Sequence, residues 1–349
     1  MKILITGGCG FIGSNFVRFA LESRDDTAMV NLDALTYSGN PESLADIESR
    51  FPDRYRFVKG DIRDLELMTS LIAEVDVLVH MAAESHVDRS IIDGRPFVET
   101  NVLGTQCLLD ALRRADPKNQ KRLVHVSTDE VYGDLPLDRP EIKFTETTPY
   151  SPSSPYSASK AASDHLVRAC QHTHRIQACI TNCSNNFGPY QFPEKVIPLF
   201  VTNLIQGMKV PLYGDGQNVR DWLHVIDHCE AVLLVAEKGE PGETYNIGGN
   251  NERSNLALTH AILEIMGHGE EMIERVADRK GHDRRYAIDA SKIARELGWE
   301  PSRSAWPEAL ETTCRWYQEN ANWWQRIRSG AYREYYAKQY EAGSGSLST

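Results

Sequence analysis

Short apolar runs alternate with longer amphipathic segments through the first half of the 349-residue chain. The periodicity of these segments predicts strands at 2–6, 28–32, 76–81, 121–126 and 176–182, and helices at 12–23, 64–74, 97–114 and 156–173. Alternation of strand and helix favours an α/β fold, a doubly wound parallel sheet with helices on both faces.

A glycine-rich turn lies between the first expected strand and the first expected helix, with Gly7, Gly10 and Gly13 in it. Glycine at this spacing lets a pyrophosphate approach the backbone at a helix N-terminus, where free N–H groups favour anions. A glycine-rich turn without a ligand would have the same sequence. Asp33 favours the interpretation that the turn binds a ligand. A carboxylate at the end of the second strand accepts hydrogen bonds from ribose hydroxyls and repels a 2′-phosphate. The two signals predict a Rossmann-like domain that binds NAD rather than NADP, with Asp61 as a candidate contact to the adenine.

The pattern becomes less regular beyond about residue 185, where proline and glycine mark loops. We therefore expect an NAD-binding, Rossmann-like domain at 1–184 and a smaller substrate-binding lobe at 185–330, from which the chain crosses back to the first domain. Residues 331–349 are expected to form a C-terminal segment with a flexible, Gly/Ser-rich tail. The aromatic run from Trp306 to Trp324 is expected to pack against the body of the protein.

The composition argues against polyanionic partners. A formal net charge of −11 gives no general attraction to nucleic acid or to an anionic membrane. No window offers the roughly 20 apolar residues that a membrane span needs. The chain runs from Met1 directly into an apolar strand without a secretory leader. We expect a cytoplasmic protein that binds neither nucleic acid nor membrane.

Seven cysteines without a C-x-x-C pair favour reduced thiols over a disulfide framework. Cys179 and Cys183 lie in an apolar stretch and are expected to pack in the core. His172 and His174 are two residues apart on an expected helix and point in different directions, so no metal site is predicted.

Tyr156 and Lys160 are four residues apart at the start of an expected helix, so their side chains share one face. A lysine ammonium beside a phenol stabilises the phenolate and lowers the pKa of the tyrosine, which makes it a base towards a substrate hydroxyl. The same pair also occurs where the tyrosine merely packs in a helix. Its place in the α/β unit, where a nicotinamide would point, favours the chemical role.

Thr128, Asp129 and Glu130 follow the apolar strand at 121–126. Adjacent carboxylates often lie in a solvated loop, but ligands bind at the carboxyl ends of strands in an open α/β sheet. Two close carboxylates push their titrations apart, so one can act as an acid and the other as a base. The pair indicates that proton removal and water loss accompany hydride transfer, with Thr128 as a hydroxyl donor.

Seven short motifs along the chain form a recognisable set. They are Gly7-x-x-Gly10-x-x-Gly13, Ala82 to Asp88, Ser127 to Gly133, Tyr156 to Lys160, Asn182 to Pro189, Gly214-Asp215-Gly216 with Arg220-Asp221-Trp222, and Asp278 to His282. Together they resemble the extended short-chain dehydrogenase/reductase superfamily and, within it, the dTDP-glucose 4,6-dehydratases, over residues 1–325. The chain departs from the usual pattern at Cys9, Ala34 and Lys280.

The resemblance implies conversion of dTDP-glucose to dTDP-4-keto-6-deoxyglucose and water, in deoxysugar biosynthesis of the dTDP-rhamnose type. It implies that Tyr156 takes the proton of the sugar 4-hydroxyl while NAD accepts hydride from C4. Glu130 would then remove the C5 proton, Asp129 would protonate the departing C6 hydroxyl, and hydride would return to C6.

The resemblance also implies a set of site residues. The catalytic set is Thr128, Asp129, Glu130, Tyr156 and Lys160. The cofactor set is Gly7, Gly10, Phe11, Ile12, Gly13, Asp33, Ala34, Leu35, Thr36, Asp61, Ile62, Ala82, Ala83, Thr100, Tyr156, Lys160 and Asn186. The substrate set is Ser85, Thr128, Asn185, Lys195, Val196, Pro211, Tyr213, Arg220, Asn255, Arg279 and His282.

Finally, the resemblance implies a homodimer joined by a four-helix bundle from the helices near 97–114 and 156–173. Two alternative functions stay open. The first is an NAD-dependent UDP-sugar 4-epimerase or decarboxylase, and the acid pair argues against the epimerase, whose usual strand end lacks it. The second is a non-catalytic NAD-binding regulatory protein, and the intact Tyr156, Lys160, Asp129 and Glu130 argue against it.

Overall fold

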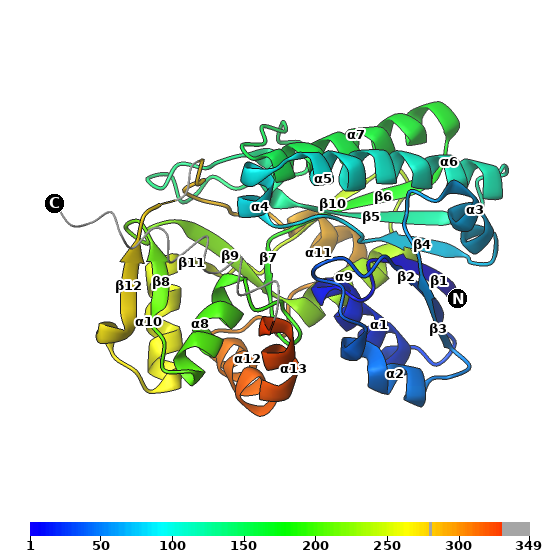
Figure 1. Ribbon diagram of the computed structural model, residues 1–349. Coiled ribbons are helices and arrows are strands. Elements are labelled where there is room, and N and C mark those ends of the chain that lie inside the picture. The colour runs from blue at the N-terminus through cyan, green and yellow to red at the C-terminus, as the bar shows by residue number, and fades with distance from the viewer. Residues whose placement is uncertain (279–280, 330–349) are drawn as a thin grey trace.

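Seven parallel strands form the central sheet of the computed structural model, which describes residues 1–278 and 281–329 (Figure 1). In their order across the sheet, the strands are β10 (Thr244–Ile247), β6 (Gln177–Cys183), β5 (Arg122–Thr128), β4 (Val77–His80), β1 (Lys2–Thr6), β2 (Ala28–Asp33) and β3 (Tyr55–Lys59). Every neighbouring pair is parallel. The expected α/β fold with a doubly wound parallel sheet is confirmed.

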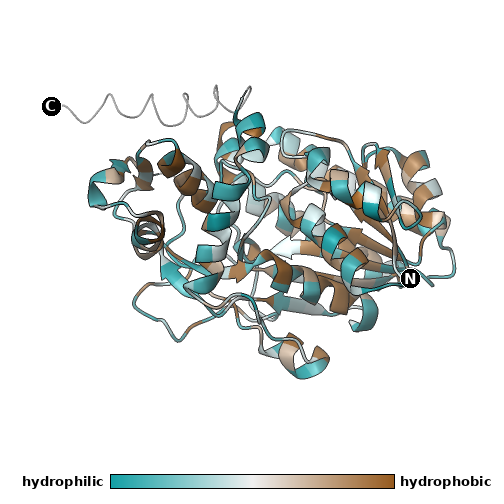
Figure 2. Ribbon diagram, turned by 90° about the horizontal axis from the view of Figure 1, so that it is seen from below, coloured by the Kyte–Doolittle hydropathy of each residue, from teal (hydrophilic) through white to brown (hydrophobic). Residues whose placement is uncertain are grey.

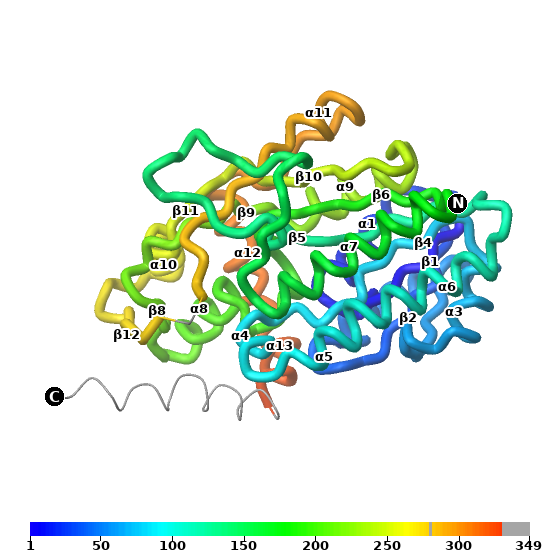
Figure 3. The backbone as a smooth tube through the Cα atoms, turned by 90° about the horizontal axis from the view of Figure 1, so that it is seen from above, coloured from blue at the N-terminus to red at the C-terminus, as the bar shows by residue number. Residues whose placement is uncertain are grey.

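Helices cover both faces of this sheet (Figure 1). One face carries α1 (Phe11–Ser23), α2 (Ala45–Arg50), α9 (Val225–Lys238) and α11 (Ser291–Leu297). The other face carries α3 (Leu65–Ala73), α6 (Thr105–Ala115) and α7 (Pro155–His174), which lie side by side in Figure 3. Successive residues of β1 divide between the two cores, because side chains alternate along a strand. Ile3 and Ile5 pack towards α1 and α9, and Leu4 packs towards α3 and α6.

All five expected strands and four expected helices are present, with one interruption. The helix expected at 97–114 consists of α5 (Arg95–Phe97), a π-helical segment η2 (Val98–Gly104) and then α6. Gly104 fits closely here, since a Cβ on it would lie 2.5 Å from Ile62 Cδ1. The strands β3 and β10 are absent from the expected set, because β3 mixes buried and exposed residues without strict alternation and β10 has only four residues.

The smaller lobe lies beside the carboxyl edge of the sheet (Figure 1). Its strands form one sheet in the order β11 (Glu252–Ser254), β9 (Val219–His224) and β7 (Asn185–Phe187), and a pair of β12 (Ile273–Val276) with β8 (Val210–Tyr213). Its helices are α8 (Val196–Ile205), α10 (Asn255–Met266), α12 (Glu308–Glu319) and α13 (Ala321–Arg328). The remaining short helices among the described residues are η1 (Pro41–Leu44), α4 (Val87–Ile92), η3 (Asp129–Tyr132) and η4 (Glu270–Met272).

The two lobes have separate apolar cores, and Figure 2 shows apolar residues gathered on the central strands. Between β9 and β11 the chain returns to the large sheet through α9 and β10. The domain limits at 1–184 and 185–330 stay a prediction, and the segment at 331–349 lies outside the described residues.

Buried thiols and aromatic rings follow the sequence expectation. Cys179 and Cys183 are buried free thiols. Tyr317 and Trp324 are fully buried in the core of the smaller lobe, and Trp316 packs edge-on against Trp323. The aromatic run therefore packs against the body, as expected.

Candidate functional site

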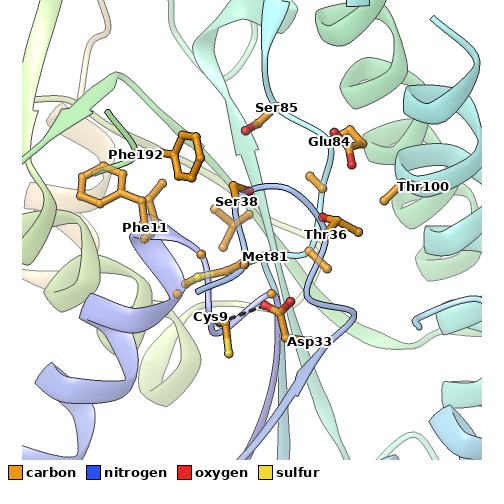
Figure 4. A pocket seen from close by; sticks show the side chains of 18 of the residues that line it. Cys9, Phe11, Asp33, Thr36, Ser38, Met81, Glu84, Ser85, Thr100 and Phe192 are labelled. Atoms are coloured by element: carbon orange, nitrogen blue, oxygen red, sulfur yellow. Dashed lines mark hydrogen bonds between the residues drawn. The ribbon is translucent and has the colours of Figure 1, made fainter. Parts of the chain in front are cut away.

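A cavity of about 320 Å³ lies at the carboxyl ends of β1, β2, β4, β5 and β6. Its walls include the glycine-rich turn, the end of β2, the segment after β4 and the end of β5. In Figure 4, Thr36, Ser38, Glu84 and Ser85 lie above Asp33, and Phe11 and Phe192 lie to the left. An open α/β sheet binds its ligands in this position.

The glycines of the turn are required for two different reasons. Gly7 has φ +77°, and a Cβ there would lie 2.7 Å from the backbone of Ala82. A Cβ on Gly13 would lie 2.2 Å from the carbonyl oxygen of Gly7, so both positions need glycine for packing of the turn. At Gly10, the N-cap of α1, the Cβ would meet only the Gly7 oxygen at 3.3 Å. Gly10 therefore leaves open space in the cavity at a helix N-terminus, which suits an anionic group.

Asp33 ends β2 at the floor of the cavity. Its Oδ2 accepts the backbone N–H of Cys9 at 2.9 Å (Figure 4), and its Oδ1 accepts that of Leu35 at 2.8 Å. Burial raises the pKa of this carboxyl, and the two backbone hydrogen bonds oppose the shift. Each oxygen retains a lone pair, so the carboxylate can accept a further hydrogen bond from a ligand hydroxyl.

Asp61 lies at the rim of the same cavity with Ile62. Arg63 Nη2 binds Asp61 Oδ2 at 2.6 Å, and this bond together with the positive charge holds the pKa of Asp61 below its usual value. The carboxylate is therefore ionised and fixed in position at the expected adenine end.

The acid pair stands where β5 ends. Thr128 caps η3, since its Oγ1 accepts the backbone N–H of Glu130 at 3.3 Å. Asp129 is buried, and its Oδ2 has no hydrogen-bond partner among the described residues. Burial, the negative charge of Glu130 and that of Asp221 raise the pKa of Asp129 well above its usual value. These effects favour the protonated form of Asp129, which is the form that an acid requires.

Tyr156 and Lys160 begin α7, whose start is fixed by a reciprocal cap between Ser154 and Ser157. Lys160 Nζ donates to the carbonyl oxygen of Val126 at 2.9 Å. Burial raises the pKa of Tyr156 well above its usual value, the charge of Glu130 adds to the rise, and a hydrogen bond with Thr128 opposes it.

The expected lowering of the pKa of Tyr156 by Lys160 is therefore wrong for this structure. The ammonium is directed to the Val126 carbonyl, and loss of solvent around the phenol dominates its titration.

A second cavity of about 170 Å³ lies between the lobes. The larger lobe contributes His86, Val87 and Asp88, and most other wall residues come from the smaller lobe. Residues Glu130, Asn185, Glu194 and Lys195 line both cavities. The two cavities thus adjoin at Glu130, and a ligand in each would meet beside the acid pair.

The structure brings nearly all expected site residues into these two cavities. Every residue of the expected cofactor set except Leu35 lines the first cavity. Leu35 instead packs against the core, with φ +54°, and fixes Asp33 through its N–H. The expected catalytic residues all line the first cavity as well.

The expected substrate residues divide between the two cavities. Ser85 and Thr128 line the first, Asn185 and Lys195 line both, and the others line the second: Val196, Pro211, Tyr213, Arg220, Asn255 and His282. Arg279 lies outside the described residues.

Sequence reasoning did not identify Tyr37, Glu194 and Tyr286. Glu194 lines both cavities, is buried and accepts a hydrogen bond from Arg89 Nη2 at 3.1 Å. Tyr286 lines the second cavity, where the guanidinium of Arg220 lies 4.2 Å from its ring centre. A single sequence carries no signal for these residues, because each comes from a segment without a local motif.

Residues 1–278 and 281–329 contain no group of three or more His, Cys, Asp or Glu side chains that could hold a metal ion. They also contain no helix with the length and apolar character needed to cross a membrane.

Known proteins share both the sequence and this architecture. A family model described as GDP-mannose 4,6 dehydratase matches residues 4–309. The dTDP-glucose 4,6-dehydratase of Salmonella typhimurium is 49% identical over 362 aligned residues, which cover 98% of this chain and 99% of the relative. That of Mycobacterium tuberculosis is also 49% identical, over 96% of this chain and 98% of the relative. The chain belongs to the dTDP-glucose 4,6-dehydratase family. The resemblance recognised from the motifs is thereby confirmed.

Solved structures separate this dehydratase family from its neighbours. A dTDP-glucose 4,6-dehydratase from Streptomyces venezuelae, solved with NAD and TYD bound, is 49% identical with a TM-score of 0.89, covering 94% of this chain and all of that one. A UDP-glucose 4-epimerase from Thermotoga maritima, covering 92% of this chain and all of that one, is 28% identical with a TM-score of 0.81. The epimerase shares the fold, while sequence identity favours the dehydratases.

Proposed function

We propose that this chain is an NAD-dependent 4,6-dehydratase that converts dTDP-glucose to dTDP-4-keto-6-deoxyglucose and water. The observation that carries the proposal is the acid pair Asp129 and Glu130 beside Tyr156, where the two cavities adjoin. Near-half identity with dTDP-glucose 4,6-dehydratases over almost the whole chain supports it.

The first cavity fits NAD. Gly10 leaves room for a diphosphate at the start of α1, and Asp33 can accept hydrogen bonds from ribose hydroxyls. When bound, NAD supplies reversible hydride acceptance. Relatives from Streptomyces venezuelae and Bacillus anthracis have been solved with NAD. Asp33 would disfavour the 2′-phosphate of NADP.

In the proposed reaction, Tyr156 takes the proton of the sugar 4-hydroxyl while C4 is oxidised. Thr128 favours the phenolate when its hydroxyl turns from Asp129 to Tyr156, because that hydrogen bond opposes the rise in the pKa of Tyr156. Lys160 lies on the same helix face, lines the first cavity and would help to hold NAD there. Oxidation at C4 makes the C5 proton acidic. Glu130, which lines both cavities, then removes that proton.

Asp129 gives its proton to the C6 hydroxyl as water departs. Burial and the neighbouring carboxylates keep Asp129 protonated until this step. Asp129 can therefore act as the acid and Glu130 as the base, although the two residues are adjacent in sequence. Return of hydride to C6, with a proton returned from Glu130 to C5, would complete a reaction without net redox change.

The second cavity would hold the nucleotide half of the substrate. Arg220 and Lys195 supply cationic groups for a diphosphate, and Arg can bind phosphate oxygens in pairs. His282 Nδ1 lies 2.6 Å from Asp278 Oδ1, which fixes the imidazole at the wall of this cavity. The role expected for Arg279 stays a prediction.

We also propose a homodimer in the cytoplasm. Val98 and Leu103 of η2 are 50% and 57% exposed, next to α6 and α7 of the expected bundle. Large apolar side chains at such exposure are suited to burial against a second copy. Sedimentation equilibrium tests the pairing, and Leu103→Glu should shift the mass towards the monomer.

The activity is tested by incubating the protein with dTDP-glucose and identifying the sugar nucleotide that forms. The proposal expects dTDP-4-keto-6-deoxyglucose. A dTDP-hexose inverted at C4 would instead identify an epimerase, and unchanged substrate with NAD bound would favour a non-catalytic protein.

A further inference from the structure

Asp164 is a fully buried carboxylate one helical turn beyond Lys160 on α7, and it lines neither cavity. Its Oδ1 lies 3.0 Å from His125 Nε2, and its Oδ2 accepts Ser127 Oγ at 2.8 Å. His125 and Ser127 flank Val126 on β5, and the Val126 carbonyl oxygen accepts Lys160 Nζ at 2.9 Å. One turn of α7 is thus bonded to three successive residues of the strand that ends in the acid pair.

The hydroxyl of Tyr150 also donates to Asp164 Oδ2, at 2.9 Å. Burial raises the pKa of Asp164, but the hydrogen bonds from His125 and Ser127 and the charge of Lys160 outweigh it and hold the pKa below its usual value. Asp164 is therefore an ionised carboxylate in a buried position.

Lys160 needs a counter-charge in this position. Burial lowers the pKa of its ammonium, and the negative charge of Asp164 opposes that shift. Among the described residues, the titratable groups whose charge acts on or is acted on by Lys160 are Asp164 on α7, His125 on β5, Cys183 on β6 and His80 on β4, and Tyr156 lies on the same face of α7. Burial lowers the pKa of both histidines and raises that of Cys183 and of Tyr156, so these four groups are neutral. Asp164 alone among them is negative at neutral pH.

We propose that Asp164 is a positioning residue that keeps Lys160 charged and holds the start of α7 in register with Asp129 and Glu130. Its consequence for hydride transfer rests on the proposed function. The charge of Lys160 can be measured without any reaction.

The test compares Asp164→Asn with Ser127→Ala in the full chain with NAD bound. The amide of Asn keeps the shape of Asp, and the two hydroxyls and the imidazole can reverse their hydrogen bonds to match it. Nuclear magnetic resonance of ¹³Cε-labelled lysine follows the titration of Lys160, with Lys160→Arg to assign the signal. Asp164→Asn should lower the titration midpoint by about one pH unit or more, because a buried counter-charge is lost. Ser127→Ala removes one hydrogen bond and keeps the charge, so the midpoint should stay where it is.

Activity provides a second readout. In Asp164→Asn the alkaline limb of the hydride-transfer rate should move to lower pH with the Lys160 midpoint, whereas Ser127→Ala should lose rate equally at all pH values. Asp164→Ser is the second neutral variant should Asp164→Asn not fold. An unchanged Lys160 midpoint in a folded neutral variant overturns the inference. A wild-type chain that leaves dTDP-glucose unchanged would contradict the proposed function, while a lowered Lys160 midpoint would still support the role of Asp164.

Discussion

Thr128 Oγ1 donates a hydrogen bond of 3.4 Å to Asp129 Oδ1, while the other oxygen of Asp129 has no partner among the described residues. A buried carboxyl with one long hydrogen bond and two acidic neighbours retains its proton. Asp129 is therefore suited to act as an acid. Ionisation of its buried carboxyl would destabilise the folded state.

Asp129→Asn should therefore be more stable than the wild type, by a margin that grows with pH. The folded pKa of Asp129 lies above its unfolded value, so the folded state binds more protons between the two values and wild-type stability falls as pH rises through that window. The neutral amide does not suffer this loss. Thermal unfolding of both proteins at acidic and at neutral pH measures the margin, and a constant margin would contradict the assignment.

Glu130→Gln should oxidise C4 but fail to eliminate water, because an amide cannot accept the C5 proton. Absorbance near about 340 nm, typical of reduced nicotinamide, should then accumulate on mixing with substrate. Glu146→Gln is a matched control, since Glu146 accepts the N–H of Asn246 and lines neither cavity. Wild-type product formation by Glu130→Gln would remove Glu130 from the elimination step.

Tyr156→Phe should lose hydride transfer itself, by roughly 10²–10⁴-fold, since no phenol remains to accept the proton of the 4-hydroxyl. The ring packing against Phe97 is retained by phenylalanine. Tyr245→Phe removes a buried hydroxyl that accepts the N–H of Glu240 away from both cavities, and should leave the rate unchanged. Stopped-flow measurement of the first turnover distinguishes the variants.

Gly10→Ala and Gly13→Ala should impair different properties, the first NAD binding and the second stability. At Gly10 a Cβ has room in the protein but would project where a diphosphate lies, so NAD affinity should fall about tenfold or more, a loss of about 1.4 kcal/mol. At Gly13 the Cβ would collide with the backbone of Gly7 and Gly8, which should destabilise the protein by about 1–3 kcal/mol. Calorimetric NAD titration and thermal unfolding check the two effects. Equal NAD affinity of Gly10→Ala and wild type would show that the cofactor lies elsewhere.

Five of the seven strands of the large sheet were predicted, because these five are apolar runs that both layers of helices bury, whereas β3 and β10 lack that pattern or length. The glycine turn, Asp33 and the acid pair were found for a related reason, since each follows a strand and carries a local pattern. The smaller lobe has strands of only three or four residues, such as Asn185–Phe187, which are too short for a reliable period. Its cavity is assembled from distant segments, from His86 to Tyr286.

The sequence also could not predict the charge effects within the site. The spacing of Tyr156 and Lys160 gave their shared face, but the direction of the ammonium depends on the Val126 carbonyl of another element. The role of Asp164 depends in the same way on contacts between α7 and β5, which spacing along the helix cannot show.

The central claim is that hydride moves from C4 to C6 of one sugar around an elimination. It is tested most directly with dTDP-glucose deuterated at C4, mixed with unlabelled substrate that carries a distinguishable heavy-atom tag, followed by mass and magnetic resonance analysis of the product. The account predicts deuterium at C6 of the same sugar that carried it at C4, with solvent hydrogen at C5, where Glu130 removes a proton. Deuterium retained at C4 of an epimerised sugar, or scrambled between tagged and untagged molecules, would contradict it.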